Sequence, residues 1–90
     1  MAQAIVNPDE IRKFINEMSR FKSELEQNRD RTNAKMRELG ESWRDHEHQK
    51  FAGEFENFIR QMNPFLKNID EYNSFLNRKA AAADNYLQQR

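Results

Sequence analysis

Apolar residues in the first half of the chain recur at alternating steps of three and four residues. This is the spacing of the a and d positions of a heptad repeat, and it predicts an amphipathic helix over residues 8–39. In the same phase the helix then carries Asn28, Thr32 and Lys35 before the apolar Met36 and Leu39. The predicted seam consists of Ile11, Phe14, Met18, Phe21 and Leu25.

Asn28 and Thr32 leave two interpretations open. As a buried polar pair they would fix the register of neighbouring helices, which is the best attested use of polar residues at such positions. As a loosely packed, partly hydrated stretch they would have no such role, and we favour this simpler interpretation.

A stronger pattern of the same kind follows and predicts a second helix over residues 43–87. It continues in phase through Lys79, Ala83 and Tyr86. Its seam is formed by Phe51, Phe55, Phe58, Met62, Phe65, Ile69, Tyr72 and Leu76. An interior proline such as Pro64 costs a helix about 3 kcal/mol. Two outcomes stay open: a kinked but continuous helix, which the unbroken seam favours, and a break with Asn63 as N-cap.

Between the two helices lies the segment Leu39-Gly40-Glu41-Ser42-Trp43-Arg44-Asp45. We expect Gly40 to end the first helix in the left-handed conformation. Ser42 is expected to cap the second helix, with Asp45 at N3 and Trp43 filling the end of the hairpin. The first helix has a clear start in Asn7-Pro8-Asp9-Glu10, with Asn7 as cap and Pro8 at N1.

The predicted fold is all-α: one antiparallel two-helix hairpin in a single domain, residues 1–90, with a flexible segment 1–7. At about 1.5 Å per residue the helices measure about 48 and about 67 Å, so the second overhangs from near Phe75. We expect residues 76–90 to form a helical overhang or a frayed tail that binds a partner. The residues proposed for that contact are Phe75, Leu76, Ala80, Ala83, Tyr86 and Leu87.

Adjacent apolar pairs such as Phe58-Ile59 and Phe65-Leu66 cannot both face one partner helix. A scaffold of this size gains little stability from a single seam. We therefore expect two hairpins to associate into a four-helix bundle, either as an antiparallel homodimer or with a related hairpin protein. In this interpretation the seam residues form the core of the bundle rather than a ligand site.

Composition removes several functional classes. Lys and Arg number 15, Asp and Glu also number 15, and the signs are interspersed, so neither nucleic acid nor an anionic membrane is a favoured partner. With no cysteine, disulfides and thiolate metal sites are excluded. The N-terminus lacks the pattern of a cleavable signal peptide, and no apolar run approaches membrane-spanning length.

Residues with catalytic or metal-binding chemistry are sparse. His46 and His48 are two apart, so on a helix they point in different directions and do not make a His-Glu-x-x-His pair. We expect ordinary solvated side chains there, no cofactor and no metal. Ser42 is the one serine with a histidine near enough in sequence to act as a catalytic base, and it is expected to serve as a cap. No glycine-rich phosphate-binding loop occurs. An enzyme is not expected.

The Trp43 bend, the turns at Phe51 and Phe55 that follow it and the opening Asn7-Pro8-Asp9-Glu10 resemble the WXG family of small helical-hairpin proteins. This family is handled by type VII (ESX) secretion systems of bacteria. The resemblance implies a homodimeric or heterodimeric four-helix bundle that acts as a secreted effector, adaptor or chaperone-like partner. It also implies contacts with a larger secreted substrate or a secretion ATPase, and a cytoplasmic protein that is exported without a cleavable signal.

Two positions depart from the family pattern. Asp45 stands where the family has glycine, and Arg90 stands four residues after Tyr86, where the family's export signal has an acid. A cytosolic coiled-coil adaptor that binds a partner helix through residues 75–90 therefore remains an alternative. A membrane-active amphipathic protein is disfavoured by the zero net charge.

Overall fold

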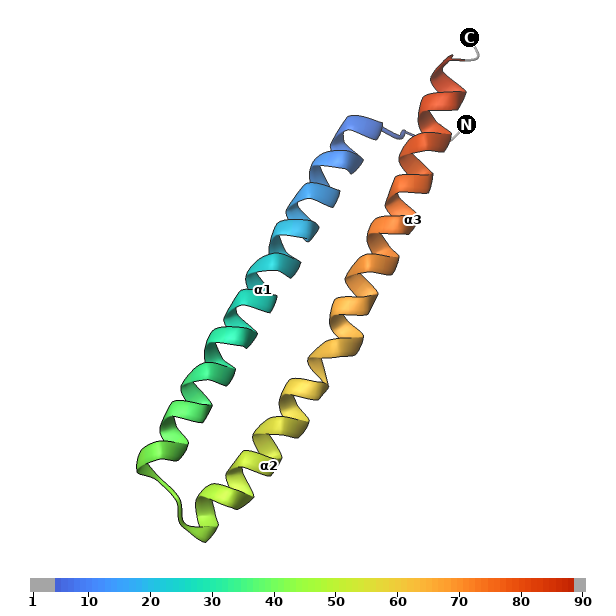
Figure 1. Cartoon of the computed structure of the whole chain (residues 1–90). Helices are drawn as coiled ribbons and strands as arrows, with labels where there is room; N and C mark the ends of the chain where they lie inside the picture. The colour runs from blue at the N-terminus through green and yellow to red at the C-terminus, as the bar shows by residue number, and fades with distance from the viewer. Residues whose placement is uncertain (1–4, 89–90) are drawn as a thin grey trace.

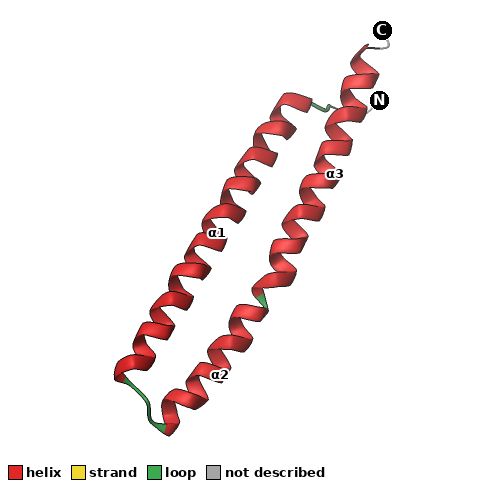
Figure 2. Cartoon of the chain, viewed as in Figure 1, coloured by secondary structure: helices red, strands yellow, loops and turns green. Residues whose placement is uncertain are grey.

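The computed structural model describes residues 5–88 and confirms the all-helical hairpin. Helix α1 spans Pro8–Ser42, α2 spans His46–Arg60 and α3 spans Met62–Gln88. Helix α1 runs one way and α2 and α3 return beside it (Figure 1). Within residues 5–88 the chain is helix and loop without strands (Figure 2). The molecule is a rod of 69 × 20 × 17 Å.

The start of α1 forms as its sequence predicts. Asn7 is extended, and its side-chain oxygen accepts hydrogen bonds from the backbone N–H groups of Asp9 and Glu10 at 3.0 and 3.3 Å. Pro8 occupies N1, where its missing N–H leaves no helical bond unmade. Asp9 and Glu10 add negative charge at the positive end of the helix dipole.

The bend is built differently from the prediction. Helix α1 continues through Gly40 to Ser42, and neither glycine has a positive φ. The Ser42 hydroxyl donates back to the carbonyl of Leu39 at 3.3 Å, so it does not cap α2. Asp45 takes that role: it is extended, and its carboxylate accepts the N–H of His48 at 3.0 Å. Ser42 and Asp45 can both act as N-caps. Asp45 takes this role because α1 then extends to Ser42 and gains a further turn of backbone hydrogen bonds.

The second arm of the hairpin is divided into α2 and α3 by one non-helical residue, Gln61. Gln61 keeps α-helical dihedral angles (φ −68°, ψ −16°), and α3 continues nearly along the direction of α2 (Figure 1). Pro64 has no N–H to donate to the carbonyl of Arg60, which is where α2 ends. This outcome lies close to the kinked helix, and Asn63 does not begin a separate helix because α3 already begins at Met62.

Three cross-helix polar contacts fix the register of the hairpin. Lys22 donates to Asp70 at 2.7 Å, Asn73 donates to Ser19 at 3.3 Å, and Arg12 pairs with Asp84. Ala80 is buried, with 1% of its surface exposed. The predicted overhang from Phe75 is therefore wrong, because α3 packs on α1 as far as Asp84. Only the last turns of α3 extend past the start of α1 (Figure 1).

Burial inside the hairpin follows a different pair of heptad positions from the predicted one. The helices meet through heptad positions a and e, where e is the residue directly after d. Leu66 and Ile69 on α3 are buried at 7% and 5% exposure. Half-buried a and e residues of α1 lie opposite, namely Ile11, Ile15, Met18, Lys22 and Leu25.

Candidate functional site

The d positions, predicted as core, lie on an open face of the hairpin. Phe21, Phe65 and Tyr72 keep between 55% and 63% of their surface exposed, and Phe51 keeps 43%. The d positions are thus exposed in the single chain, and their place in the core of a four-helix bundle stays a prediction. Each heptad has three apolar positions, a, d and e, but each helix of the hairpin has only one partner helix. Because the e positions face that partner, the d positions stay outside. The exposed d-position aromatics are Phe14, Phe21, Phe51, Phe58, Phe65 and Tyr72.

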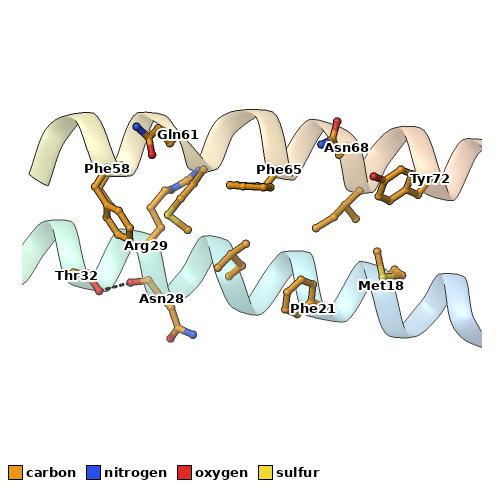
Figure 3. A pocket seen from close by; sticks show the side chains of 14 residues that line it. Met18, Phe21, Asn28, Arg29, Thr32, Phe58, Gln61, Phe65, Asn68 and Tyr72 are labelled. Atoms are coloured by element: carbon orange, nitrogen blue, oxygen red, sulfur yellow. Dashed lines mark hydrogen bonds between the residues drawn. The ribbon is translucent and has the colours of Figure 1, made fainter.

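Phe21, Phe58, Phe65 and Tyr72 of this set line an apolar groove of about 630 Å³ that runs between α1 and the return helices. On the α1 side it extends from Met18 to Thr32, and on the other side from Phe58 to Tyr72. In Figure 3 the rings of Phe58, Phe65 and Tyr72 come from one wall, and Phe21 and Met18 come from the other. The floor is formed by the a positions Leu25, Met62 and Ile69. We call this surface, groove and aromatic rim together, the groove face.

Polar residues of the groove face are satisfied within α1 or point away from the apolar floor. The Thr32 hydroxyl donates to the backbone carbonyl of Asn28 at 2.8 Å, and both residues are exposed in the single chain (Figure 3). The amide of Asn28 points away from the opposite wall in Figure 3. Arg29 is 22% exposed and its guanidinium bonds to the carboxylate of Asp30 at 3.2 Å. The single chain therefore shows no buried Asn28–Thr32 pair.

Trp43 closes the bend end of the hairpin and begins a series of aromatic contacts. Its ring lies 5.0 Å from that of His48, edge to face, and 6.2 Å from Phe51. Phe51 contacts Phe55, and Phe55 contacts Phe58, with centroids 6.2 and 6.4 Å apart. Such pairs each add roughly 0.5–1.5 kcal/mol beyond their buried area. The series links the bend to the groove.

His48 was predicted to be an ordinary solvated side chain, and this prediction is wrong, because its ring packs into the bend against Trp43. Its ring lies against Gly40: a Cβ built there would meet His48 Cε1 at 3.5 Å and Nε2 at 3.6 Å. The Nε2 atom is buried and has no hydrogen-bond partner. The local sequence pattern held no signal for this contact, because Gly40 and His48 belong to different helices.

Two ion pairs at the surface join α1 to α3. The hydrogen bond to Asp70 raises the pKa of Lys22 above its ordinary value, and the hydrogen bond to Asp84 does the same for the pKa of Arg12. Among residues 5–88 no cluster of three or more His, Cys, Asp or Glu side chains is placed to hold a metal ion. The site can therefore bind a partner through its shape and its apolar surface.

The residues predicted to form a partner-binding tail differ in their exposure. Ala80 is buried, while Leu76 and Ala83 are half-buried in the hairpin. Phe75, Tyr86 and Leu87 stay exposed at 58%, 68% and 46%. Arg90 lies outside the described residues.

Comparison with known proteins adds the decisive observation. The WXG100 family, described as proteins of 100 residues with WXG, matches residues 3–89. The chain belongs to the WXG100 family. As a member it is a small helical protein associated with secretion. No curated protein and no solved structure gives a significant match.

The WXG100 motif departs from its name in this chain, and the structure gives the reason. Asp45, in the place of the glycine, has φ −82° and ψ −178°, which any residue adopts. A carboxylate there accepts the His48 N–H, so the position contributes a cap rather than backbone freedom. No helix among the described residues is long and apolar enough to cross a bilayer.

Proposed function

We propose that this WXG100 protein is a non-enzymatic hairpin of a type VII (ESX) secretion system, whose groove face is covered by a second hairpin to give a four-helix bundle. The observation that carries the proposal is the groove face itself. A monomer rarely leaves so many large aromatic side chains together in water unless they bind something. A second hairpin of the same kind has the length and the helical surface to cover the whole face.

In this role the protein acts as an effector, an adaptor or a chaperone-like partner of a larger secreted substrate. Its family supports a secretion-associated role. We place it in the cytoplasm before export, without a cleavable signal peptide. Neither nucleic acid nor a membrane is a partner, since the charges balance and their signs alternate along the helices.

Export is tested in the bacterium that encodes the chain. A tagged copy is expected in the culture supernatant of the parent strain, and to be retained in the cells when the secretion ATPase is deleted. A cytoplasmic marker enzyme measured in the same fractions controls for lysis. Retention in the cells of both strains would contradict export.

A second candidate function rests on the exposed end of α3. Phe75, Tyr86 and Leu87 keep about half or more of their surface free, as a cytosolic adaptor binding a partner helix would require. Under this alternative, a chain ending at residue 84 keeps its hairpin, because Asp84 still pairs with Arg12, but loses its partner in a pull-down. Retained binding would count against it.

A further inference from the structure

We propose that a hollow at the bend binds a small organic acid, a carboxylate carried on a short apolar group, through Arg37 and Arg44. The hollow has a volume of about 400 Å³ and lies between the end of α1 and the start of α2. It has no lining residue in common with the groove. A ligand there and a partner on the groove face occupy separate surfaces, so this site is independent of the proposed function. We call it the bend hollow.

The apolar part of the bend hollow comes from residues with small side chains on both helices. Gly40 of α1 has no side chain and Ala52 of α2 has only a methyl group, so the two helices leave space between them. Met36 adds a longer apolar side chain to the lining. Small-molecule sites measure roughly 300–1,000 Å³, and the bend hollow is at the lower end of this range. The lining therefore suits a ligand with a short apolar group.

Two arginines on the rim supply positive charge that the hairpin does not neutralise. Arg37 and Arg44 are both exposed, and within residues 5–88 neither forms an ion pair. Nε of Arg44 donates to the backbone carbonyl of Gly40 at 3.3 Å, which holds the guanidinium beside the hollow and leaves its Nη groups for a ligand. A guanidinium offers parallel N–H donors that match the two oxygens of a carboxylate.

His48 adds a polar group that lacks a partner. Its ring lines the bend hollow, and Nε2 is buried without a hydrogen-bond partner in the described part of the chain. A buried polar group that is left unpaired lowers stability. Nε2 lies on the side of Gly40, 3.6 Å from where a Cβ would stand. Since both residues line the bend hollow, a small turn of the ring brings this nitrogen to a ligand oxygen bound there.

Glu41 determines which kind of anion fits. It is the acidic residue of the lining, it is exposed, and it forms no ion pair within residues 5–88. Two arginines against one glutamate leave one excess positive charge beside a neutral His48. One excess charge matches a carboxylate, whereas a doubly charged phosphate would meet more repulsion from Glu41. The charge of the lining thus favours a monoanion.

The first experiment uses the two glycines as reporters. Gly40 lines the bend hollow, whereas a Cβ at Gly53 would meet nothing within 4 Å. In a chain labelled with ¹⁵N-glycine, 3-methylbutanoate is expected to shift the Gly40 amide signal to saturation, with a dissociation constant on the order of 1 mM. The Gly53 signal is expected to move less than half as far. The matched control is the uncharged 3-methylbutanamide at the same ionic strength, which is expected to move neither signal.

Three results would overturn the site. They are a Gly40 signal that does not move, one that moves equally with the acid and the amide, and one that moves no further than the Gly53 signal. N-acetylleucine separates a free acid from the C-terminus of another chain, because it carries the same carboxylate and apolar group on a peptide-like body. Tighter binding of N-acetylleucine than of 3-methylbutanoate would assign the bend hollow to a chain terminus and overturn the free acid.

The second experiment removes the charges of the rim one at a time. Arg37→Gln and Arg44→Gln are each expected to weaken binding of 3-methylbutanoate about tenfold, because each removes a charge-assisted contact. Arg78→Gln is the matched control, since Arg78 is an exposed arginine of α3 outside the bend hollow, and it is expected to change the dissociation constant less than twofold or so. Weakening by Arg78→Gln as large as that by Arg37→Gln would overturn the site.

Glu41→Gln is expected to change the affinity in the opposite direction. Without the repelling carboxylate, 3-methylbutanoate should bind about threefold more tightly. Glu41 and the three arginines are exposed, so circular dichroism is expected to show the helical content of the parent chain in all four variants. Unchanged or weaker binding by Glu41→Gln at full helical content would contradict the charge selection and overturn the proposal.

Discussion

At the scale of single residues, the bend shows how a cap is chosen between two competent side chains. Ser42 and Asp45 both accept N–H groups well, and sequence alone gave no reason to prefer the later one. The choice depends on how far α1 can extend, which in turn depends on His48 fitting against Gly40. That contact joins residues from two helices and was not visible in the local pattern. The Asn7 cap was predictable because Pro8 leaves one position for it.

Asp45→Ala is expected to lower the free energy of unfolding by about 1 kcal/mol, because the N–H of His48 loses its acceptor. Ser42→Ala is the matched control and is expected to change it by less than about 0.5 kcal/mol. Urea denaturation at one fixed protein concentration measures both. A larger loss for Ser42→Ala than for Asp45→Ala would restore the cap predicted from sequence.

Both glycines are expected to tolerate alanine. Gly40 and Gly53 lie inside helices without positive φ, and a Cβ meets His48 at an ordinary 3.5 Å in one case and nothing within 4 Å in the other. Gly40→Ala and Gly53→Ala should each stabilise the protein by roughly 0.5–1 kcal/mol, because alanine is the better helix former. Thermal melting followed by circular dichroism measures the change. Destabilisation by Gly40→Ala alone would mean that the bend needs a left-handed residue.

At the scale of helices, the heptad pattern predicted which residues are apolar but not which of them meet inside the hairpin. Positions a, d and e are all apolar at Ile69, Phe65 and Leu66, so two adjacent seams compete for one partner helix. The rotation of each helix decides between them, and it depends on packing along the full length. Small and polar e residues, such as Ala80 and Asn73, fit the close inner contact, while the large rings fit better outside.

The Lys22–Asp70 contact between α1 and α3 is expected to stabilise the hairpin at neutral pH and to lose its effect in strong base. The pKa of Lys22 is raised above 10.5 in the folded chain, so its contribution is complete below pH 10.5 and disappears as the pH rises through the raised value. Comparing the parent chain with Lys22→Gln in urea at pH 7 and above pH 11 measures this. A difference that persists unchanged at the higher pH would contradict it.

At the scale of the whole molecule, the hairpin places apolar surface in two separate layers. One layer holds α1 to the return helices, and the other faces outward across the groove. The overall hairpin followed from the two heptad patterns and the bend between them, and the proposal of a second hairpin followed from the width of the apolar stripe. The shortness of the overhang could not be predicted from the sequence, because α1 extends three residues beyond Leu39 and contacts such as Arg12–Asp84 set the register.

Two neighbouring residues separate these layers experimentally. Leu66→Ala removes a side chain only 7% exposed and is expected to destabilise the fold by about 2–5 kcal/mol. Phe65→Ser changes a side chain 63% exposed, and it should leave the helical content of the dilute chain intact while abolishing concentration-dependent association. Circular dichroism and sedimentation equilibrium read the two effects. Loss of helix in dilute Phe65→Ser would place Phe65 in the inner layer.

The two ends of the described chain, residues 5 and 88, lie at the same end of the rod, opposite the bend (Figure 1). A force that pulls these two ends apart therefore opens the hairpin as a zipper, breaking the Arg12–Asp84 contact first and the Trp43 contacts last. Contacts broken one after another resist force far less than contacts sheared together. Separating residues 5 and 88 by force would therefore meet little mechanical resistance from this protein.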